Sequence, residues 1–286
     1  MTEKRLDAEY SRSQLAELIA LRLDDQTVAE AAQQFKSGSG CQWFVIDNLL
    51  PEHIAKNIYS AFPDPKSMRE RKTIREHKYV AAQMNKYPPL GEEALFSFHD
   101  PRIVERVARI TGMPNLNPDR HLYAGGLSLM GRDNFLNPHL DNSHNNDRTE
   151  YRVLNLLYYV SPNWTESNGG NLELWPNGLN NDPITIASKF NRLVVMTTGP
   201  DSWHSVNQVK VDAPRCCVSN YYFSTHPVGG KDYFRVTTFR GRPEQPLRDL
   251  VLRADAALRQ ALRRIKPTGL VKTTHIYKRD EDPEKK

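Results

Sequence analysis

The chain has 286 residues, of which 38% are hydrophobic and 26% charged, with three cysteines and a formal net charge of +5. The length fits one large domain or two small ones, and the composition is that of a globular protein with a substantial core. The odd cysteine total argues against a disulfide framework. The longest nearly apolar run, Val153 to Val160, is far too short to span a membrane, and the charged amino terminus shows no secretory signal. We therefore expect no membrane association and a reducing, cytoplasmic location.

Positive charge is densest in residues 66–78. No zinc-finger spacing, helix-turn-helix signal or aromatic RNA-binding motif accompanies this stretch, so we expect no nucleic-acid partner. Two interpretations stay open: a solvated face or mobile loop, or a basic lid that meets an anionic substrate.

The first elements along the chain are two predicted helices, over about 12–23 and 27–36. Ser11 is a candidate cap for the first, and Thr27 with Glu30 forms a candidate capping box for the second. The segment CQWFVIDNLL then predicts a strand, because it is rich in β-branched and aromatic residues.

A helix from Pro51 to about Ala61 follows that strand. The stretch 62–90 is rich in charge and proline and indicates a long loop or lid. A further helix is predicted over about 100–111 and ends at Gly112.

From His121 to Ser224 the pattern changes to short apolar or alternating runs separated by Gly, Pro, Asn and Asp. They are HLYAGGLSLM, RVLNLLYYV, NLELW, PITIA, RLVVMTT, WHSVNQV and RCCVSNYYFS. Short strands at this spacing are typical of an all-β sandwich or jelly roll.

The last predicted element is an amphipathic helix in PLRDLVLRADAALRQALRRIK. We expect it to buttress the sheet through an apolar stripe made of Leu247, Leu250, Val251, Ala254, Leu258, Ala261, Leu262 and Ile265. The expected organisation is one catalytic unit with a helical and strand support region that includes the basic lid (1–120), a β core (121–240), this helix (241–270) and a tail (271–286), of which KRDEDPEKK is expected to be disordered.

The segment FLNPHLDNSH carries the most informative chemistry. His139 and Asp141 lie two residues apart, so an extended chain projects both from one face. His204, in a strand-like run 65 residues further on, is the candidate third ligand. Two histidines and one carboxylate form the facial triad of non-heme iron(II) oxygenases. A bare His-x-Asp also occurs by chance in surface loops, so further residues have to support this interpretation.

Arg215 is the first such residue, 11 residues after His204 on the next predicted strand. A buried arginine there can hold the distal carboxylate of 2-oxoglutarate in a bidentate pair, which its planar guanidinium suits better than a lysine ammonium. The strand-and-turn pattern between Asp141 and His204 is the second support.

Residues 41–62 and 121–224 together resemble the Fe(II)/2-oxoglutarate-dependent oxygenases of the prolyl 4-hydroxylase-like branch. The matching motifs are FVIDNLLPEHIAKNI, His139-Leu140-Asp141, Arg152 through Val160, Gly169 to Leu174, Trp203-His204 and Pro214-Arg215. The resemblance implies a mainly β protein with flanking helices, built on a double-stranded β-helix (jelly roll) core.

By this resemblance, His139, Asp141 and His204 would bind Fe(2+), and Arg215 would bind the C5 carboxylate of 2-oxoglutarate. Tyr159 matches a tyrosine that supports the same carboxylate, although it could equally be a core tyrosine. Asn155, on the same strand face, could line the pocket or bridge strands. Cys217 departs from the pattern, since some branches carry a serine there.

The implied activity is a dioxygenase that consumes O2 and 2-oxoglutarate, with ascorbate as a stimulant, and releases succinate and CO2. Related halogenases replace the carboxylate ligand with a small residue, so Asp141 favours hydroxylation. The substrate would be a small metabolite or a protein residue, with the basic stretch favouring an anionic one. The alternatives are a non-catalytic jelly-roll or cupin-like binding protein, and a metal-dependent cupin isomerase or dioxygenase without a cosubstrate.

Overall fold

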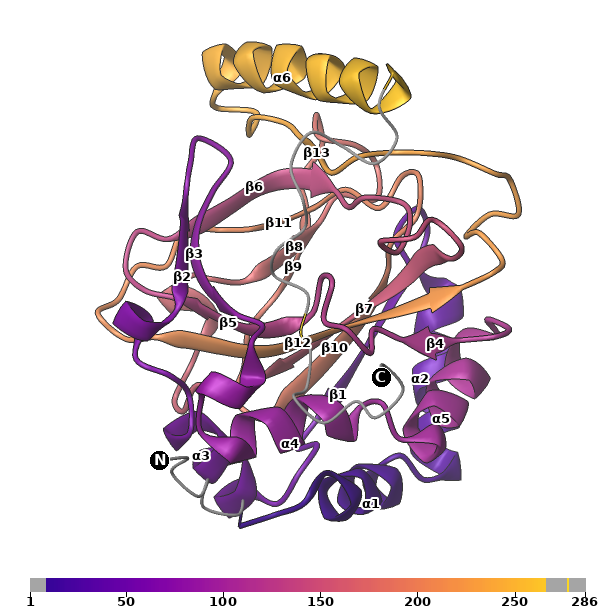
Figure 1. Ribbon diagram of the computed structural model, residues 1–286, viewed down its shortest axis with the longest axis vertical. Coiled ribbons are helices and arrows are strands. Elements are labelled where there is room, and N and C mark those ends of the chain that lie inside the picture. The colour runs from indigo at the N-terminus through magenta and orange to yellow at the C-terminus, as the bar shows by residue number, and fades with distance from the viewer. Residues whose placement is uncertain (1–8, 266–276, 278–286) are drawn as a thin grey trace, which may run out of the picture.

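The computed structural model describes residues 9–265 and Tyr277, so the tail predicted over 271–286 lies outside the described residues except at Tyr277. Its α-helices are α1 Arg12–Arg22, α2 Asp25–Ser37, α3 Glu52–Ser60, α4 Pro89–Ser97, α5 Pro101–Thr111 and α6 Pro246–Ile265. Helices α1 to α5 gather on one side of a curved sheet, and α6 lies apart from them beside β13 (Figure 1). No helix within the described part of the chain is long and apolar enough to cross a membrane.

The strands form one antiparallel sheet that folds over on itself. They are β1 Trp43–Asp47, β2 Arg69–Lys72, β3 Glu76–Ala81, β4 Asn117–Pro118, β5 Gly126–Met130, β6 Phe135–Leu140, β7 Tyr151–Tyr159, β8 Leu172–Leu174, β9 Ile184–Ile186, β10 Arg192–Thr197, β11 His204–Val206, β12 Arg215–Ser224 and β13 Thr238–Phe239. The order is β1-β10-β7-β12-β5-β3-β6-β11-β8-β9. Strand β3 pairs with both β5 and β6 and so joins the two halves of the jelly roll. The predicted fold class is confirmed.

The helices on the outer side shield the half of the sheet that contains β1, β10, β7, β12 and β5. Leu15 and Ile19 of α1, Phe35 of α2 and Val107 of α5 are fully buried in one apolar cluster with the outward side chains of this half. Full burial of each such side chain stabilises the fold by about 1.5–3 kcal/mol. This packing leaves the opposite, inner face of the strands free to form a cavity.

The predicted helix caps are partly confirmed. Ser11 caps α1 in a capping box that Gln14 completes. The second capping box is wrong, because Asp24 caps α2 and accepts a hydrogen bond from the backbone N–H of Thr27 at 2.7 Å. A carboxylate at the N-cap also interacts favourably with the helix dipole.

The stretch 62–90 contains more structure than the predicted loop. Strands β2 and β3 form a hairpin, which we call the β2–β3 hairpin, and α4 begins at Pro89. All four residues of β2, RERK, are charged, so the strand lacks the alternation of apolar and polar residues by which a strand is recognised. Pairing of β3 with β5 and β6 supplies the hydrogen bonds that the local pattern did not predict.

The C-terminal helix α6 forms as predicted, but the expectation that its apolar stripe is buried is wrong. Leu247, Leu250 and Leu258 are 80%, 66% and 61% exposed. The helix packs instead through Leu252, which is fully buried in a cluster with Phe239 of β13. An ion pair from Asp249 to Arg240, at 2.6 Å, holds the start of α6 to the segment after β13. These contacts turn the face of α6 that contains Leu252 toward the sheet and leave the face with Leu247, Leu250 and Leu258 exposed.

Candidate active site

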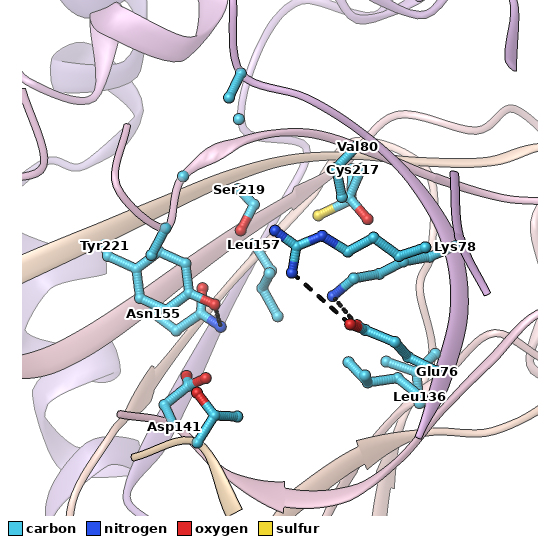
Figure 2. A pocket seen from close by; sticks show the side chains of 18 of the residues that line it. Glu76, Lys78, Val80, Leu136, Asp141, Asn155, Leu157, Cys217, Ser219 and Tyr221 are labelled. Atoms are coloured by element: carbon cyan, nitrogen blue, oxygen red, sulfur yellow. Dashed lines mark hydrogen bonds and ion pairs between the residues drawn. The ribbon is translucent and has the colours of Figure 1, made fainter. Parts of the chain in front are cut away.

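A cavity of about 520 Å³ opens on the inner face of the sheet. Its walls carry His139, Asp141, His204 and Arg215, which come from β6, the loop after it, β11 and β12. Asp141 lies on one side of the cavity and Glu76 and Lys78 of β3 lie on the other, with Cys217 and Ser219 on the wall between (Figure 2). The fold thus brings to one space residues that are remote in sequence.

His139, Asp141 and His204 form one tight cluster. His139 of β6 and His204 of β11 lie directly opposite each other in the antiparallel pairing, with ring centroids 4.1 Å apart. The Nε2 atoms of His139 and His204 lie 3.8 Å from Oδ1 and Oδ2 of Asp141, respectively. One ligand atom of each residue lies within 4.8 Å of the others, so the three could hold one metal ion.

Backbone carbonyl groups orient both imidazoles. Nδ1 of His139 lies 3.0 Å from the carbonyl oxygen of Asn137, and Nδ1 of His204 lies 2.9 Å from that of Ser202. Donation from Nδ1–H leaves the Nε2 lone pair facing the cluster, which is the arrangement that metal ligation requires. Burial lowers the pKa of His139 to about 3 and also lowers that of His204, so both rings stay neutral.

Arg152 is a buried neighbour of the cluster that sequence reasoning missed. Its Nη1 lies 3.3 Å from Oδ1 of Asp141, and its guanidinium stacks over the ring of Tyr221 at 4.4 Å. Burial acts to raise the pKa of Asp141, but the positive charge of Arg152 outweighs it, so the pKa lies below its usual value. Asp141 is therefore ionised.

A β-bulge explains why strand alternation did not point to Arg152. Leu154 pairs with Tyr222 and Arg152 with Phe223, which leaves Val153 as an extra residue in β7. The bulge reverses the alternation, so Arg152 joins Asn155 on the cavity side.

Arg215 lies at another wall of the cavity and is almost fully buried. Its Nε donates to the carbonyl oxygen of Gly170 at 3.0 Å and to Oγ of Ser188 at 3.3 Å. The guanidinium lies over the Tyr159 ring at 4.6 Å. These contacts fix the side chain mainly through Nε. Nη1 also donates to Sδ of Met130 at 3.8 Å, and no carboxylate of the described residues pairs with the guanidinium.

The Gly169-Gly170 turn makes this placement possible. Gly169 has a φ of +73°, and a Cβ there would lie 2.0 Å from the carbonyl oxygen of Gln208. Gly170 has a φ of +66°, and its Cβ would press on Arg215 Cγ at 3.3 Å. The motif is therefore a packing requirement for the wall that holds Arg215.

Replacement of Gly169 by alanine is expected to lower the free energy of unfolding by about 3 kcal/mol, because backbone strain adds to a steric clash. Thermal unfolding followed by circular dichroism should show a melting temperature several degrees lower. Gly131→Ala is the control, since no atom lies within 4 Å of its Cβ position. Equal melting temperatures for the two variants would contradict the packing role.

The other residues predicted for the site also face this region. Tyr159 is fully buried beside Arg215, and burial raises its pKa to about 12, so the hydroxyl keeps its proton. Asn155 lines the cavity and donates from Nδ2 to the hydroxyl of Tyr221 at 3.2 Å (Figure 2). Cys217 lines the cavity as well.

Ser143 and His144, which follow Asp141, form hydrogen bonds away from the metal cluster. Ser143 Oγ lies 2.7 Å from His144 Nδ1 and accepts from the backbone N–H of Arg235 at 2.9 Å. The cluster is supported instead by Arg152 and by Phe239 of β13, whose ring stacks on His139 at 5.0 Å. No local sequence signal marked Phe239, because its position depends on the pairing of β13 with β6.

Buried polar atoms without a hydrogen-bond partner, around the cavity and beside Arg215, include Oδ2 of Asp141, Oδ1 of Asn155 and the hydroxyl of Tyr159. Buried polar groups are normally paired, so these atoms indicate a missing ligand. A divalent metal suits the carboxylate and two neutral imidazoles, and a carboxylate suits Arg215 with the Tyr159 hydroxyl. The donor set thus fits Fe(2+) together with 2-oxoglutarate.

Comparison with protein families gives a match over residues 125–223 to the model described as the 2OG-Fe(II) oxygenase superfamily. The matched segment contains all the residues of the metal cluster and Arg215. No curated protein matches the chain at a significant level.

Several solved structures share the fold. A prolyl-4-hydroxylase from Pseudomonas putida has a TM-score of 0.52 at 12% identity, covering 68% of this chain and 97% of that one. A prolyl 4-hydroxylase from Phytophthora capsici has a TM-score of 0.52 at 17% identity, covering 92% and 82%. The α-ketoglutarate-dependent carbocyclase SnoK from nogalamycin biosynthesis has a TM-score of 0.51 at 13% identity, covering 79% and 90%.

The named reactions of these structures differ although their fold is the same, so the fold alone does not identify a substrate. The family match over residues 125–223, the jelly-roll fold and the His-Asp-His cluster agree with one another. Together they make this part of the chain similar to the 2OG-Fe(II) oxygenase superfamily, whose name specifies Fe(2+), 2-oxoglutarate and an oxygenase reaction.

Proposed function

We propose that the protein is an Fe(2+)- and 2-oxoglutarate-dependent dioxygenase that hydroxylates a small metabolite or a residue of a protein, with conversion of 2-oxoglutarate to succinate and CO2. The observation that carries this proposal is the shared cavity, in which a His-Asp-His cluster and a buried arginine without a carboxylate partner among the described residues line the same space. We further propose that residues 121–240 form the catalytic core, supported by 1–120 and by the helix in 241–270.

His139, Asp141 and His204 are proposed to bind Fe(2+) through the two Nε2 atoms and the carboxylate. Three ligands on one side leave other coordination positions open for the cosubstrate and O2. Bound Fe(2+) and 2-oxoglutarate supply the oxidising chemistry, in which one atom of O2 enters the substrate and the other enters succinate.

The protein itself orients and protects the reactants. The carbonyl groups of Asn137 and Ser202 hold the imidazoles, and Arg152 holds Oδ1 of Asp141. Arg215 is proposed to bind the C5 carboxylate of 2-oxoglutarate, with the Tyr159 hydroxyl donating a second hydrogen bond. Asn155 is proposed to line the cosubstrate side of the cavity.

Asp141 bears on the type of reaction. A small residue at this position would leave room for an added anion on the metal, and the carboxylate of Asp141 takes that place. Its depressed pKa keeps it charged, and therefore competent as a ligand, across the physiological range. Hydroxylation is thus the proposed outcome.

The three free and buried cysteines support a reducing compartment, and we propose the cytoplasm. A non-catalytic binding protein with the same fold is the alternative function. It would retain the cavity but would not consume cosubstrate.

The test is aerobic incubation with Fe(2+), 2-oxoglutarate and ascorbate, followed by succinate measurement, with a panel of small metabolites and peptides. We expect succinate release coupled to a mass gain of one oxygen in one substrate, and loss of both when EDTA removes the metal. Absence of succinate under all of these conditions would favour the binding protein.

A further inference from the structure

The β2–β3 hairpin has two faces with different surroundings. Arg69 and Arg71 of β2 line the cavity together with Lys78 of β3, and Arg75 lines it from the turn. Glu70 and Lys72, which alternate with the arginines, do not line it. Because successive strand side chains point to opposite faces, the hairpin presents one cationic side to the active site. We call Arg69, Arg71, Arg75 and Lys78 the hairpin cation cluster.

Charge in the cavity is unbalanced. The described residues that line it include seven arginines or lysines and two carboxylates, Glu76 and Asp141. The two positive charges of Fe(2+) and the two negative charges of 2-oxoglutarate cancel. Asp255 of α6 adds one nearby carboxylate, which pairs with Arg75 and Arg259. A cleft that keeps such an excess attracts and concentrates anions.

Local pairing leaves part of the cluster uncompensated. Lys78 Nζ lies 2.9 Å from Glu76, and Arg71 Nη1 lies 3.7 Å from the same carboxylate. Burial acts to raise the pKa of Glu76, but Lys78 and Arg71 outweigh it, so Glu76 is ionised. One carboxylate therefore serves two cations.

Two donors in the cluster are buried without a hydrogen-bond partner, Nε of Arg71 and Nε of Arg75. An unpaired buried donor is costly, and an oxyanion would satisfy it. Glu76 and Lys78 project into the cavity from the side opposite Asp141 (Figure 2). A ligand held at the hairpin would thus extend toward the metal cluster.

We propose that the substrate carries a compact oxyanion, a phosphate or a carboxylate, and that Arg71, Arg75 and Lys78 bind it. The proposal rests on the proposed function, because it places the substrate in the same cavity. Guanidinium groups form bidentate pairs with both kinds of oxyanion. The anion fixes one end of the substrate, and the carbon to be oxidised lies against His139, Asp141 and His204.

The test measures anion binding rather than turnover. Protein loaded with Mn(2+) in place of Fe(2+), and saturated with 2-oxoglutarate to fill the Arg215 side, is titrated calorimetrically with inorganic phosphate and, separately, with acetate. We expect saturable binding of at least one anion. Preference for phosphate indicates a phosphorylated substrate, and preference for acetate indicates a carboxylate; both outcomes support the proposal.

Arg71→Gln is expected to raise the dissociation constant of that anion about tenfold, and Lys78→Met should raise it similarly. Lys72→Gln is the matched control, because it removes one charge from the outward side of the same strand, and its dissociation constant should stay at the wild-type value. Melting temperatures of the variants report whether the hairpin remains folded.

Three results would overturn the proposal: no anion binding, equal effects of Arg71→Gln and Lys72→Gln, or weaker 2-oxoglutarate binding in Arg71→Gln, which would assign Arg71 to the cosubstrate. Failure of the proposed function can be distinguished from failure of this anion-binding proposal. In that case succinate would not form with any substrate, whereas the anion titration could still succeed. Succinate formation without hairpin-dependent anion binding would reject the substrate class alone.

Discussion

Replacement of Arg215 by alanine is expected to weaken 2-oxoglutarate binding about 100-fold while the affinity for the metal stays unchanged. Arg215 is buried and held through Nε by Gly170 and Ser188, so its fork is already oriented before a ligand binds. Loss of one partner of a buried charge pair costs about 2–5 kcal/mol, and about 2.7 kcal/mol corresponds to a factor of 100. Calorimetric titration of the Mn(2+)-loaded protein with 2-oxoglutarate measures the change.

Arg215→Lys keeps the charge but loses the planar fork, so it should bind 2-oxoglutarate with an affinity between those of the wild type and Arg215→Ala. Arg132→Ala is the control for loss of an arginine, because Arg132 is 55% exposed and pairs with Asp212 away from the cavity. An unchanged 2-oxoglutarate affinity in a folded Arg215→Ala protein would show that the cosubstrate binds elsewhere.

Replacement of His204 by alanine is expected to lower the affinity for Fe(2+) at least about 100-fold and to abolish succinate formation. Loss of a group that merely orients a metal ligand already costs about 10- to 100-fold, and loss of the ligand itself costs at least as much. Anaerobic titration with Fe(2+), or aerobic titration with Mn(2+), measures the affinity directly.

His144→Ala provides the matched control, since His144 lies close to Asp141 in sequence but bonds to Ser143 and packs on Tyr151. Its metal affinity should equal that of the wild type. Tight stoichiometric metal binding by His204→Ala would remove His204 from the proposed ligand set and with it the proposed mechanism.

Periodicity predicted much of the fold, since strands and helices differ in the spacing of their apolar residues. The strand in RLVVMTT became β10, RCCVSNYYFS became β12, and α5 ends at Gly112 as expected. The prediction failed for RERK in β2, because a strand that faces a polar cavity and solvent carries no apolar alternation. Only its pairing with β3 reveals it.

The same limit applies to α6 and to Arg152. Apolar residues at three- and four-residue steps predicted the α6 helix, but Leu252, rather than the predicted stripe, packs on Phe239. From Leu154 onward, the side chains of β7 alternate between the two faces of the sheet as expected. The bulge at Val153 reverses this alternation, so the Arg152 side chain lies on the cavity side. In both cases the decisive contact is with a partner remote in sequence.

The sequence by itself determined the chemistry that is available: two histidines and an aspartate suited to a divalent metal, an arginine suited to a carboxylate, and strand patterns typical of a jelly roll. Tertiary structure alone decided which of these groups meet. The opposition of His139 and His204 depends on the pairing of β6 with β11, and the cationic wall depends on the insertion of β3 between β5 and β6. The physical reason is that side-chain periodicity follows from local backbone geometry, whereas strand pairing and register follow from packing across the whole chain.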